Sequence, residues 1–135
     1  MNAPLPNEVL PAYERRAAPR AMLEALRERF GDRCSTAAAL CEQHGRDESP
    51  YPVTPPEVVV FCDSTDEVAF VVAQASAHGV PVIPFGVGSS LEGQLLAVQG
   101  GVSVDLSRMT RVVHVNAEDL TVTVEAGVTR EQLNR

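Results

Sequence analysis

The sequence predicts an α/β fold, and three segments carry this prediction. Residues 58–62 (VVVFC) form a continuously apolar, β-branched run, which is typical of a strand covered on both faces. An amphipathic helical pattern follows, with a capping box predicted at Ser64 and Glu67 and a stop at Gly79. Residues 80–85 (VPVIPF) form a second apolar strand. This order predicts a right-handed crossover unit with a parallel pair of strands.

Two further helices are expected before this unit. Residues 1–16 contain three prolines and no periodicity, so we interpret them as an arm. Pro19 suits the first turn of a helix that ends at Gly31. A short second helix is expected from an N-cap at Ser35 to a stop at Gly45. The apolar stripe of the first helix consists of Met22, Leu23, Leu26 and Phe30.

The spacing of apolar residues changes to every second position in the last third of the chain. Apolar and polar residues alternate over residues 102–107, which predicts a half-buried strand. A hairpin is expected over residues 111–125. Thr129 and Gln132 predict the capped start of another helix just before the chain ends, so we expect a fragment of a longer protein.

The composition argues against several classes of function. The formal net charge is −7, and the arginines near the N-terminus alternate with acids, which argues against nucleic-acid binding. No apolar run predicts a membrane-spanning helix or a signal peptide, so a cytoplasmic location is expected, with peripheral membrane association left open. Cys34, Cys41 and Cys62 are odd in number and lack C-x-x-C spacing, which predicts free thiols and no metal site.

A glycine-rich segment follows the second strand of the crossover unit. Gly86, Gly88 and Gly93 permit positive φ and let successive N–H groups turn toward one point, as in a phosphate or pyrophosphate site. Ser89 and Ser90 add hydroxyl donors. The segment has no lysine for a P-loop, and leucine stands where a dinucleotide fingerprint needs its third glycine. These residues alone leave a phosphate-type ligand and a purely structural loop equally open.

Several other polar residues have structural interpretations that compete with functional ones. Asp105 is interpreted as the polar face of a strand or the anchor of a turn, with a ribose-binding carboxylate as the alternative. Asp47 and Glu48 are expected to hydrogen-bond within their loop, with a cofactor or substrate role as the alternative. The scattered histidines are interpreted as helix-end and strand-face residues, not as ligands or bases. These histidines are His44, His78 and His114.

Six motifs, taken in order, carry a resemblance to a known family. They are HGRDES, PPEVVVF, STDEV, GVPVIPFGVGSSLEG, GGVSVDLSRM and VEAGVT, within residues 44–129. With this order and spacing, the chain resembles the N-terminal part of the cytochrome-linked, FAD-dependent D-lactate dehydrogenases and of the glycolate oxidase FAD subunits. These enzymes belong to the flavoprotein group of vanillyl-alcohol oxidase and p-cresol methylhydroxylase, whose FAD domain is called PCMH-type.

The resemblance implies a PCMH-type FAD-binding fold, α+β when whole. This chain would hold its N-terminal parallel α/β lobe and the start of its antiparallel lobe. An arm with helices, residues 1–50, would precede the FAD-binding domain, residues 51–135, which is incomplete at its C-terminus. Ala126, Gly127 and Val128 are expected near the cofactor as weaker candidates. By position, the residues assigned to the FAD pyrophosphate are Pro84, Phe85, Gly86, Val87, Gly88, Ser89, Ser90, Leu91 and Gly93.

The resemblance also implies an activity for the whole enzyme. It would oxidise a D-2-hydroxy acid such as D-lactate to the 2-oxo acid, with electrons leaving FAD for a cytochrome, a quinone or an electron-transfer flavoprotein. Non-covalent FAD is expected, because no histidine that could tether the flavin lies between His78 and His114. Gln94 departs from relatives, which often carry glycine there. The family's catalytic residues lie beyond Arg135, so none is assigned here.

An alternative interpretation is a non-catalytic α/β binding module, or an inactive truncated remnant of such an enzyme. It predicts that the strand edge left by the missing antiparallel lobe is covered, since an open edge invites association.

Overall fold

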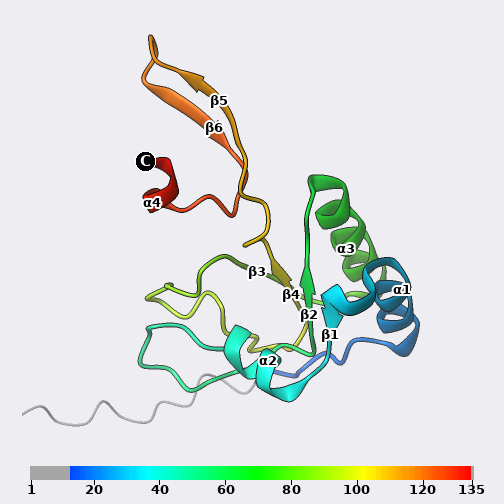
Figure 1. Cartoon of the computed structure of the whole chain (residues 1–135). Coiled ribbons are helices and arrows are strands. Elements are labelled where there is room, and N and C mark those ends of the chain that lie inside the picture. Colours follow the sequence, from blue (N-terminus) through cyan, green and yellow to red (C-terminus); the bar gives the residue numbers. More distant parts are fainter. Residues whose placement is uncertain (1–12, 135) are drawn as a thin grey trace, which may run out of the picture.

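A four-stranded sheet organises residues 13–134, the part of the chain that the computed structural model describes (Figure 1). In spatial order, its strands are β1 (Cys34–Ser35), β2 (Val58–Phe61), β4 (Val102–Asp105) and β3 (Val82–Phe85). β4 runs parallel to both of its neighbours, whereas β1 is antiparallel to β2. A separate antiparallel hairpin consists of β5 (Val112–Asn116) and β6 (Thr121–Val124).

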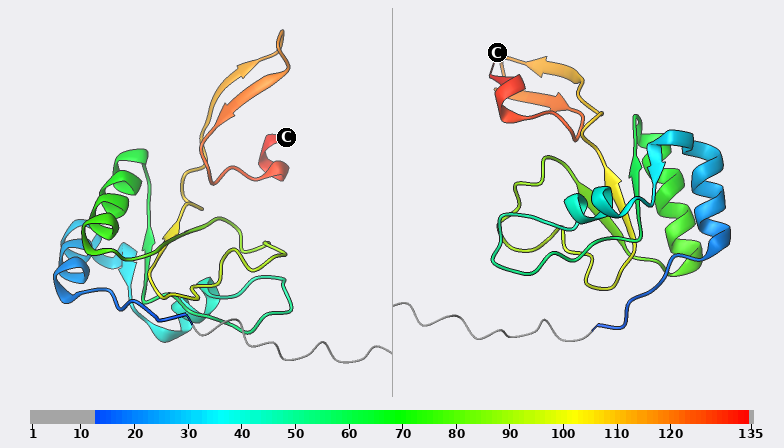
Figure 2. Two further views of the ribbon diagram at one scale, coloured as in Figure 1. Left: turned by 180° about the vertical axis from the view of Figure 1, so that it is seen from behind. Right: turned by 60° about the horizontal axis from the view of Figure 1, so that its bottom comes forward.

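Helices cover both faces of this sheet. They are α1 (Arg20–Phe30), α2 (Ala38–His44) and α3 (Thr65–His78), with a 3-10 turn at Gly31–Arg33. α4 (Arg130–Leu133) lies near the hairpin instead, away from the sheet (Figure 1). α1 and α3 lie side by side on one face, and α2 lies on the other (Figure 2). An α/β fold with a parallel sheet and a small antiparallel pair is therefore confirmed.

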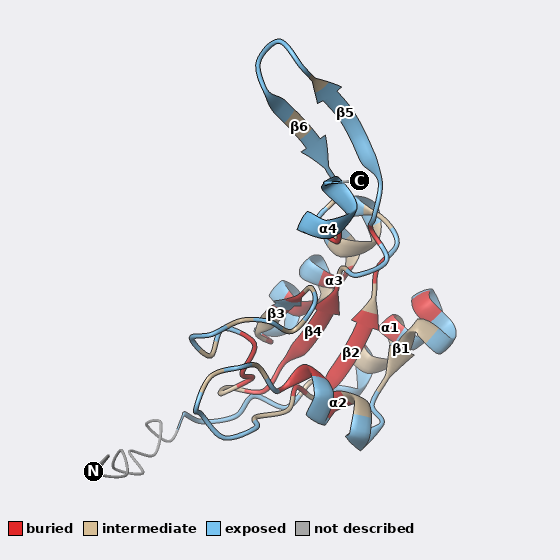
Figure 3. Cartoon of the chain, turned by 60° about the vertical axis from the view of Figure 1, so that its left-hand side comes forward, coloured by how far each residue is buried: buried red, intermediate tan, exposed pale blue. Residues whose placement is uncertain are grey.

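The main core lies between the sheet and the pair formed by α1 and α3. Alternate residues of β2 point into it, and Figure 3 shows β2 and β4 as the buried centre of the fold. The core residues are Met22, Leu26, Phe30, Val58, Val60, Cys62, Val71, Ala75, Val80, Val102, Val104 and Met109. Because α1 and β1 share this core and sheet, residues 13–50 pack with the rest of the fold; the domain boundary at residue 50 stays a prediction.

The expected pairing of the two crossover strands is wrong. β2, α3 and β3 follow one another as predicted, but β4 lies between β2 and β3, with Val102 opposite both Val58 and Val82. β4 is buried along its whole length, including Ser103 and Asp105, so its alternation does not mark an exposed face. Local patterns predict strands but not their lateral order, because that order depends on segments far apart in the chain.

The second helix begins later than predicted, because Ser35 belongs to the sheet. Ser35 lies in β1 opposite Val59 of β2. Its hydroxyl accepts a hydrogen bond from the N–H of Ala37 at 3.2 Å. Ala37 is the N-cap residue of α2, which starts at Ala38, and the predicted stop at Gly45 is confirmed.

Other helix ends agree with the sequence prediction. Gly31 and Gly79 adopt positive φ, 54° and 63°, directly after α1 and α3. Thr129 and Gln132 form a reciprocal capping box at the start of α4.

Cys41 and Cys62 are buried and Cys34 is partly buried. Within residues 13–134, no helix is long and apolar enough to cross a membrane.

The β5–β6 hairpin stands away from the main sheet (Figures 1 and 2). The hairpin predicted over residues 111–125 is confirmed, and Arg111 and Glu125 join its open end through an ion pair of 2.6 Å. Its apolar side chains face solvent, most of all Leu120, which is 91% exposed. Two strands without a covered face are marginal by themselves. The hairpin therefore leaves apolar surface available for packing.

Arg33 and Glu67 fasten the 3-10 turn after α1 to the start of α3. The Arg33 guanidinium donates two hydrogen bonds of 2.7 Å to the Glu67 carboxylate and one of 3.2 Å to the carbonyl of Phe61. The Glu67 carboxylate also accepts from Asp63 N–H, while Ser64 Oγ accepts from Glu67 N–H, so the predicted capping box is only half formed. The hydrogen bonds from Arg33 lower the pKa of Glu67 to about 2.

Glu67→Gln is expected to destabilise the chain near pH 7 by about 2 kcal/mol, because it removes a partly buried, charge-assisted pair. A carboxyl whose pKa is lowered in the folded state stabilises the fold at pH values above its ordinary pKa. That contribution is lost as the pH falls through the lowered pKa. The deficit of the variant should therefore shrink as pH falls from 4.5 to about 2. Urea unfolding at several pH values measures it, with Glu28→Gln on the exposed face of α1 as the control. Equal stability of Glu67→Gln and wild type at pH 7 would contradict this role.

Candidate functional site

The glycine-rich loop leaves the sheet at the carboxyl end of β3. Parallel strands end at one edge of a sheet, and ligands of α/β folds bind outside that edge. Gly88 and Gly93 have φ of 75° and 80°, so the positive φ predicted for them is confirmed. Gly86 does not use this freedom, because its φ is not positive, and a Cβ at its position would meet no atom within 4 Å. The loop therefore turns at Gly88 and Gly93.

A row of main-chain donors lies free along this loop. Within residues 13–134, none of the six N–H groups of residues 86–91 donates a hydrogen bond to a protein acceptor. The side chains of Val87 and Leu91 are 66% and 71% exposed, so they do not shield these donors. Consecutive free N–H groups around a residue with positive φ form a site for an anion. The loop therefore offers main-chain donors to an anion.

A second loop, residues 45–50, holds the glycine-rich loop in place. Asp47 Oδ2 accepts a hydrogen bond from Gly93 N–H at 2.9 Å, and the N–H of Glu48 donates to the carbonyl of Ser90 at 2.9 Å. Asp47 Oδ1 accepts from the hydroxyl and the N–H of Ser49. The hydrogen bond from the Ser49 hydroxyl is the main cause that lowers the pKa of Asp47. The loop-bonding role expected of Asp47 is confirmed, and it extends to a second loop.

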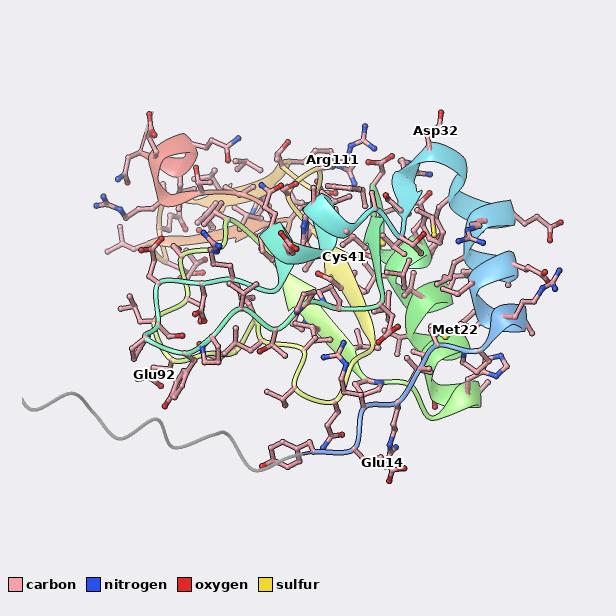
Figure 4. The ribbon with its side chains drawn as sticks, turned by 90° about the horizontal axis from the view of Figure 1, so that it is seen from below. Glu14, Met22, Asp32, Cys41, Glu92 and Arg111 are labelled. Carbon is pink, nitrogen blue, oxygen red and sulfur yellow. The ribbon has the colours of Figure 1, made fainter. Side chains whose placement is uncertain are left out.

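The hydroxyl of Ser90 has a partner within the protein. It donates to Oε1 of Gln94, which also accepts from the N–H of Glu92 at 3.3 Å. Gln94 therefore shapes the exit of the loop through its side chain. Figure 4 shows Glu92 at the outer end of the loop, away from Cys41 in α2.

A pocket of about 400 Å³ lies between the glycine-rich loop, α2 and the loop at residues 45–50. Phe85, Val87 and Gly88 form its side on the glycine-rich loop. Its other lining residues are Ala39, Glu42, Gln43, Arg46, Asp47 and Glu48. Three carboxylates against one guanidinium make this pocket acidic, so an anion at this edge depends on the main-chain donors.

A buried polar pair lies beneath the loop. His44 Nε2 is 2.8 Å from Asp105 Oδ2, and both side chains are almost fully buried. Asp105 Oδ1 accepts from Ser107 N–H, so its predicted role as a turn anchor is confirmed. Burial raises the pKa of Asp105, but the hydrogen bonds from His44 and Ser107 outweigh it and leave this pKa below its ordinary value. The sequence offers no signal for the pair, because its members lie far apart along the chain.

Gly127 packs against the turn that follows β4. Its N–H donates to the carbonyl of Met109 at 2.9 Å. A Cβ at Gly127 would lie 2.1 Å from the carbonyl oxygen of Leu106. The position therefore requires glycine for packing, and no hydrogen bond among the described residues joins it to the glycine-rich loop. Residues 13–134 contain no group of three His, Cys, Asp or Glu side chains that could hold a metal ion.

The family described as "FAD binding domain" matches residues 56–135, and the chain therefore belongs to this family. The expected FAD cofactor is thereby confirmed. In fold, the chain is similar to p-cresol methylhydroxylase, with a TM-score of 0.77 at 21% identity over 91% of this chain and 26% of that protein. The PCMH-type fold expected from the sequence is therefore confirmed.

The relatives are named as 2-hydroxy-acid dehydrogenases or oxidases, and they include D-lactate dehydrogenases, a glycolate oxidase subunit and D-2-hydroxyglutarate dehydrogenases. The chain is 45% identical to the probable mitochondrial D-lactate dehydrogenase of Danio rerio over 119 residues, which cover 87% of this chain and 24% of that protein. It is 33% identical to the mitochondrial D-lactate dehydrogenase [cytochrome] of Arabidopsis thaliana over 123 residues, or 90% of this chain and 22% of that protein. The chain thus spans about a quarter of the length of the curated relatives it matches. The resemblance stated from the motifs is confirmed.

The expectation of a cytoplasmic location is wrong, because these two D-lactate dehydrogenases are mitochondrial proteins by name. The expectation rested on the lack of a membrane or signal segment, and such a lack carries no positive information about a compartment.

Two glycine substitutions should differ sharply in their effect on stability. Gly127→Ala is expected to cost about 3 kcal/mol or more, because its Cβ would overlap a backbone carbonyl that cannot move freely. Gly86→Ala should change stability by no more than about 0.5 kcal/mol, since its position is open. Thermal unfolding of the two variants measures the difference. A small effect of Gly127→Ala would show that the turn after β4 can shift.

Proposed function

We propose that this chain supplies the FAD-pyrophosphate site of a longer flavoprotein that oxidises a D-2-hydroxy acid. The observation that carries the proposal is the row of six free N–H groups at residues 86–91. Pyrophosphate is the anionic part of FAD, and main-chain donors at the carboxyl edge of a parallel sheet suit it. In this proposal the residues that bind it are Pro84, Phe85, Gly86, Val87, Gly88, Ser89, Ser90, Leu91 and Gly93, with Gly127 nearby.

The residues of the loop would divide the work of binding FAD. The main chain from Gly86 to Leu91 would donate to the phosphate oxygens, because the exposed side chains of Val87 and Leu91 carry no polar group. Asp47 would act indirectly by holding Gly93 in place. FAD would be bound non-covalently, since the segment between His78 and His114 offers no histidine for a tether.

The substrate and the electron acceptor belong to the same proposal. When bound, the flavin supplies the hydride acceptor for the oxidation of the 2-hydroxy acid to the 2-oxo acid. D-Lactate is the first substrate to test, because two of the relatives reported above are named for it. The electrons would leave for a cytochrome, a quinone or an electron-transfer flavoprotein. This segment contributes cofactor binding and orientation, and no catalytic residue is assigned to it.

The exposed hairpin weighs against a free-standing binding module. That alternative predicts a covered strand edge, whereas among the described residues β5 and β6 pair only with each other, so their outer edges are unpaired. Val113, Val115 and Leu120 of the hairpin are also 61%, 64% and 91% exposed. An apolar surface of this kind fits a partner lobe supplied by further chain.

The decisive experiment measures the flavin of the complete polypeptide that the proposal requires. Its visible absorption is recorded in the native state and after denaturation, and D-lactate, glycolate and D-2-hydroxyglutarate are then added anaerobically. We expect flavin bands that pass into solution on denaturation and bleach with one of these acids. A colourless protein that takes up no added FAD would refute the proposal. Bands that stay with the denatured chain would refute non-covalent binding.

Gly88→Val should release FAD while leaving the fold intact. The branched side chain would stand among the free N–H groups, and at a φ of 75° it would also strain the turn. A suitable host is the Danio rerio relative with its matching segment replaced by this chain. We expect flavin content to fall at least about tenfold, as measured by absorbance per protein. Gly79→Val is the matched control, because it has the same strain (φ 63°) in open space at the end of α3. Normal flavin content in Gly88→Val would refute the assignment of the loop.

A further inference from the structure

The pair formed by His44 and Asp105 is a buried polar feature that the proposed function does not use. His44 is 2% exposed and Asp105 is 3% exposed. Burial of polar groups costs free energy unless their hydrogen bonds are satisfied, so the pair has to be held in a defined geometry. It joins the end of α2 to the end of β4, the central strand of the sheet.

Hydrogen bonds at both ring nitrogens fix the orientation of His44. Nδ1 lies 3.0 Å from the carbonyl oxygen of Leu40, which can only accept, so Nδ1 carries a hydrogen. Nε2 faces Asp105 Oδ2 at 2.8 Å, and the other carboxylate oxygen accepts from Ser107 N–H. The imidazole plane therefore cannot rotate without breaking a buried hydrogen bond.

The fixed imidazole packs against the residue that begins the glycine-rich loop. Its centroid lies 4.1 Å from that of the Phe85 ring, at an interplanar angle of 35°. The Phe61 ring at the end of β2 contacts it edge-on at 5.8 Å. Phe85 in turn lies under Gly88, because a Cβ at Gly88 would be 3.2 Å from Phe85 Cζ. A continuous chain of contacts thus runs from Asp105 through His44 and Phe85 to Gly88.

We propose that His44, oriented by Asp105, is a positioning residue that holds the loop of residues 86–91 in its anion-binding conformation through Phe85. Its link to FAD rests on the function proposed above, whereas its effect on the loop does not. A residue that merely fills the core would lower global stability and leave the order of the loop in the folded state unchanged. A positioning residue changes that order while the chain stays folded.

The first test compares the order of the loop in three variants of the 135-residue chain. His44→Gln removes the ring that supports Phe85. Asp105→Asn keeps both hydrogen bonds, because its amide N–H₂ can donate to Nε2 and its oxygen can accept from Ser107. Val71→Ala is the matched control, since it opens the buried core on the other face of the sheet without touching the loop. All spectra are recorded at a temperature at which unfolding curves show every variant to be folded.

Backbone ¹⁵N relaxation gives the readout. In His44→Gln we expect the order parameters of residues 86–91 to fall from about 0.85 to below about 0.6, and in Asp105→Asn and Val71→Ala to stay at the wild-type level. Wild-type order in the loop of His44→Gln would overturn the proposal. A loop that is already mobile in the wild-type chain would also overturn it.

The second test measures FAD affinity by quenching of flavin fluorescence in the Danio rerio host described above. We expect His44→Gln to weaken binding at least about tenfold and the two other variants to stay within about threefold of wild type. An unchanged affinity in His44→Gln would overturn the link to the cofactor. If the wild-type host binds no FAD, the proposed function fails, and the relaxation measurement still decides the positioning role.

Discussion

The parallel pairing of β4 with both β2 and β3 is the constraint on which the rest of this structure depends. Because Val102 lies opposite Val58 and Val82, all three strands end at the same level of the sheet. Phe61, Phe85 and Asp105 therefore meet at one edge. α2 closes this edge with His44, whose ring touches both phenylalanines and bonds the carboxylate. A change in the order of the strands would separate these contacts, even if every helix and strand still formed.

The same edge reconciles an acidic chain with an anionic cofactor. The net charge is −7, and the pocket beside the glycine-rich loop holds more carboxylates than guanidinium groups. Main-chain N–H groups do not depend on side-chain charge, so a loop with free donors can attract phosphate oxygens where lysine and arginine are scarce. Asp47 contributes here by holding Gly93 in place. The Asp47 carboxylate fastens two loops to each other. The hydrogen bonds that it accepts reduce the free-energy cost of placing a negative charge there.

The hairpin follows this edge in the chain and is placed by it. Gly127 packs against the turn after β4 and so fixes where the chain leaves the hairpin. Beyond that turn, the described residues form a single pair of strands, and its apolar side chains are exposed. They are positioned by the main sheet but are not stabilised by a core of their own. This arrangement agrees with a chain that spans about a quarter of its relatives.

The sequence by itself determined every strand except β1, the helices, most of their caps, the glycine-rich loop and the family, because each rests on residues close together in the chain. It could not place Ser35 in the sheet, put β4 between β2 and β3, or pair His44 with Asp105. Those outcomes depend on the lateral order of the strands, which only packing of the whole sheet decides. The need for glycine at position 127 also depends on a distant segment. The carbonyl that excludes a Cβ there belongs to Leu106, which precedes the hairpin in the chain, whereas Gly127 follows it. Local patterns specify elements, and long-range backbone pairing brings their ends together into a site.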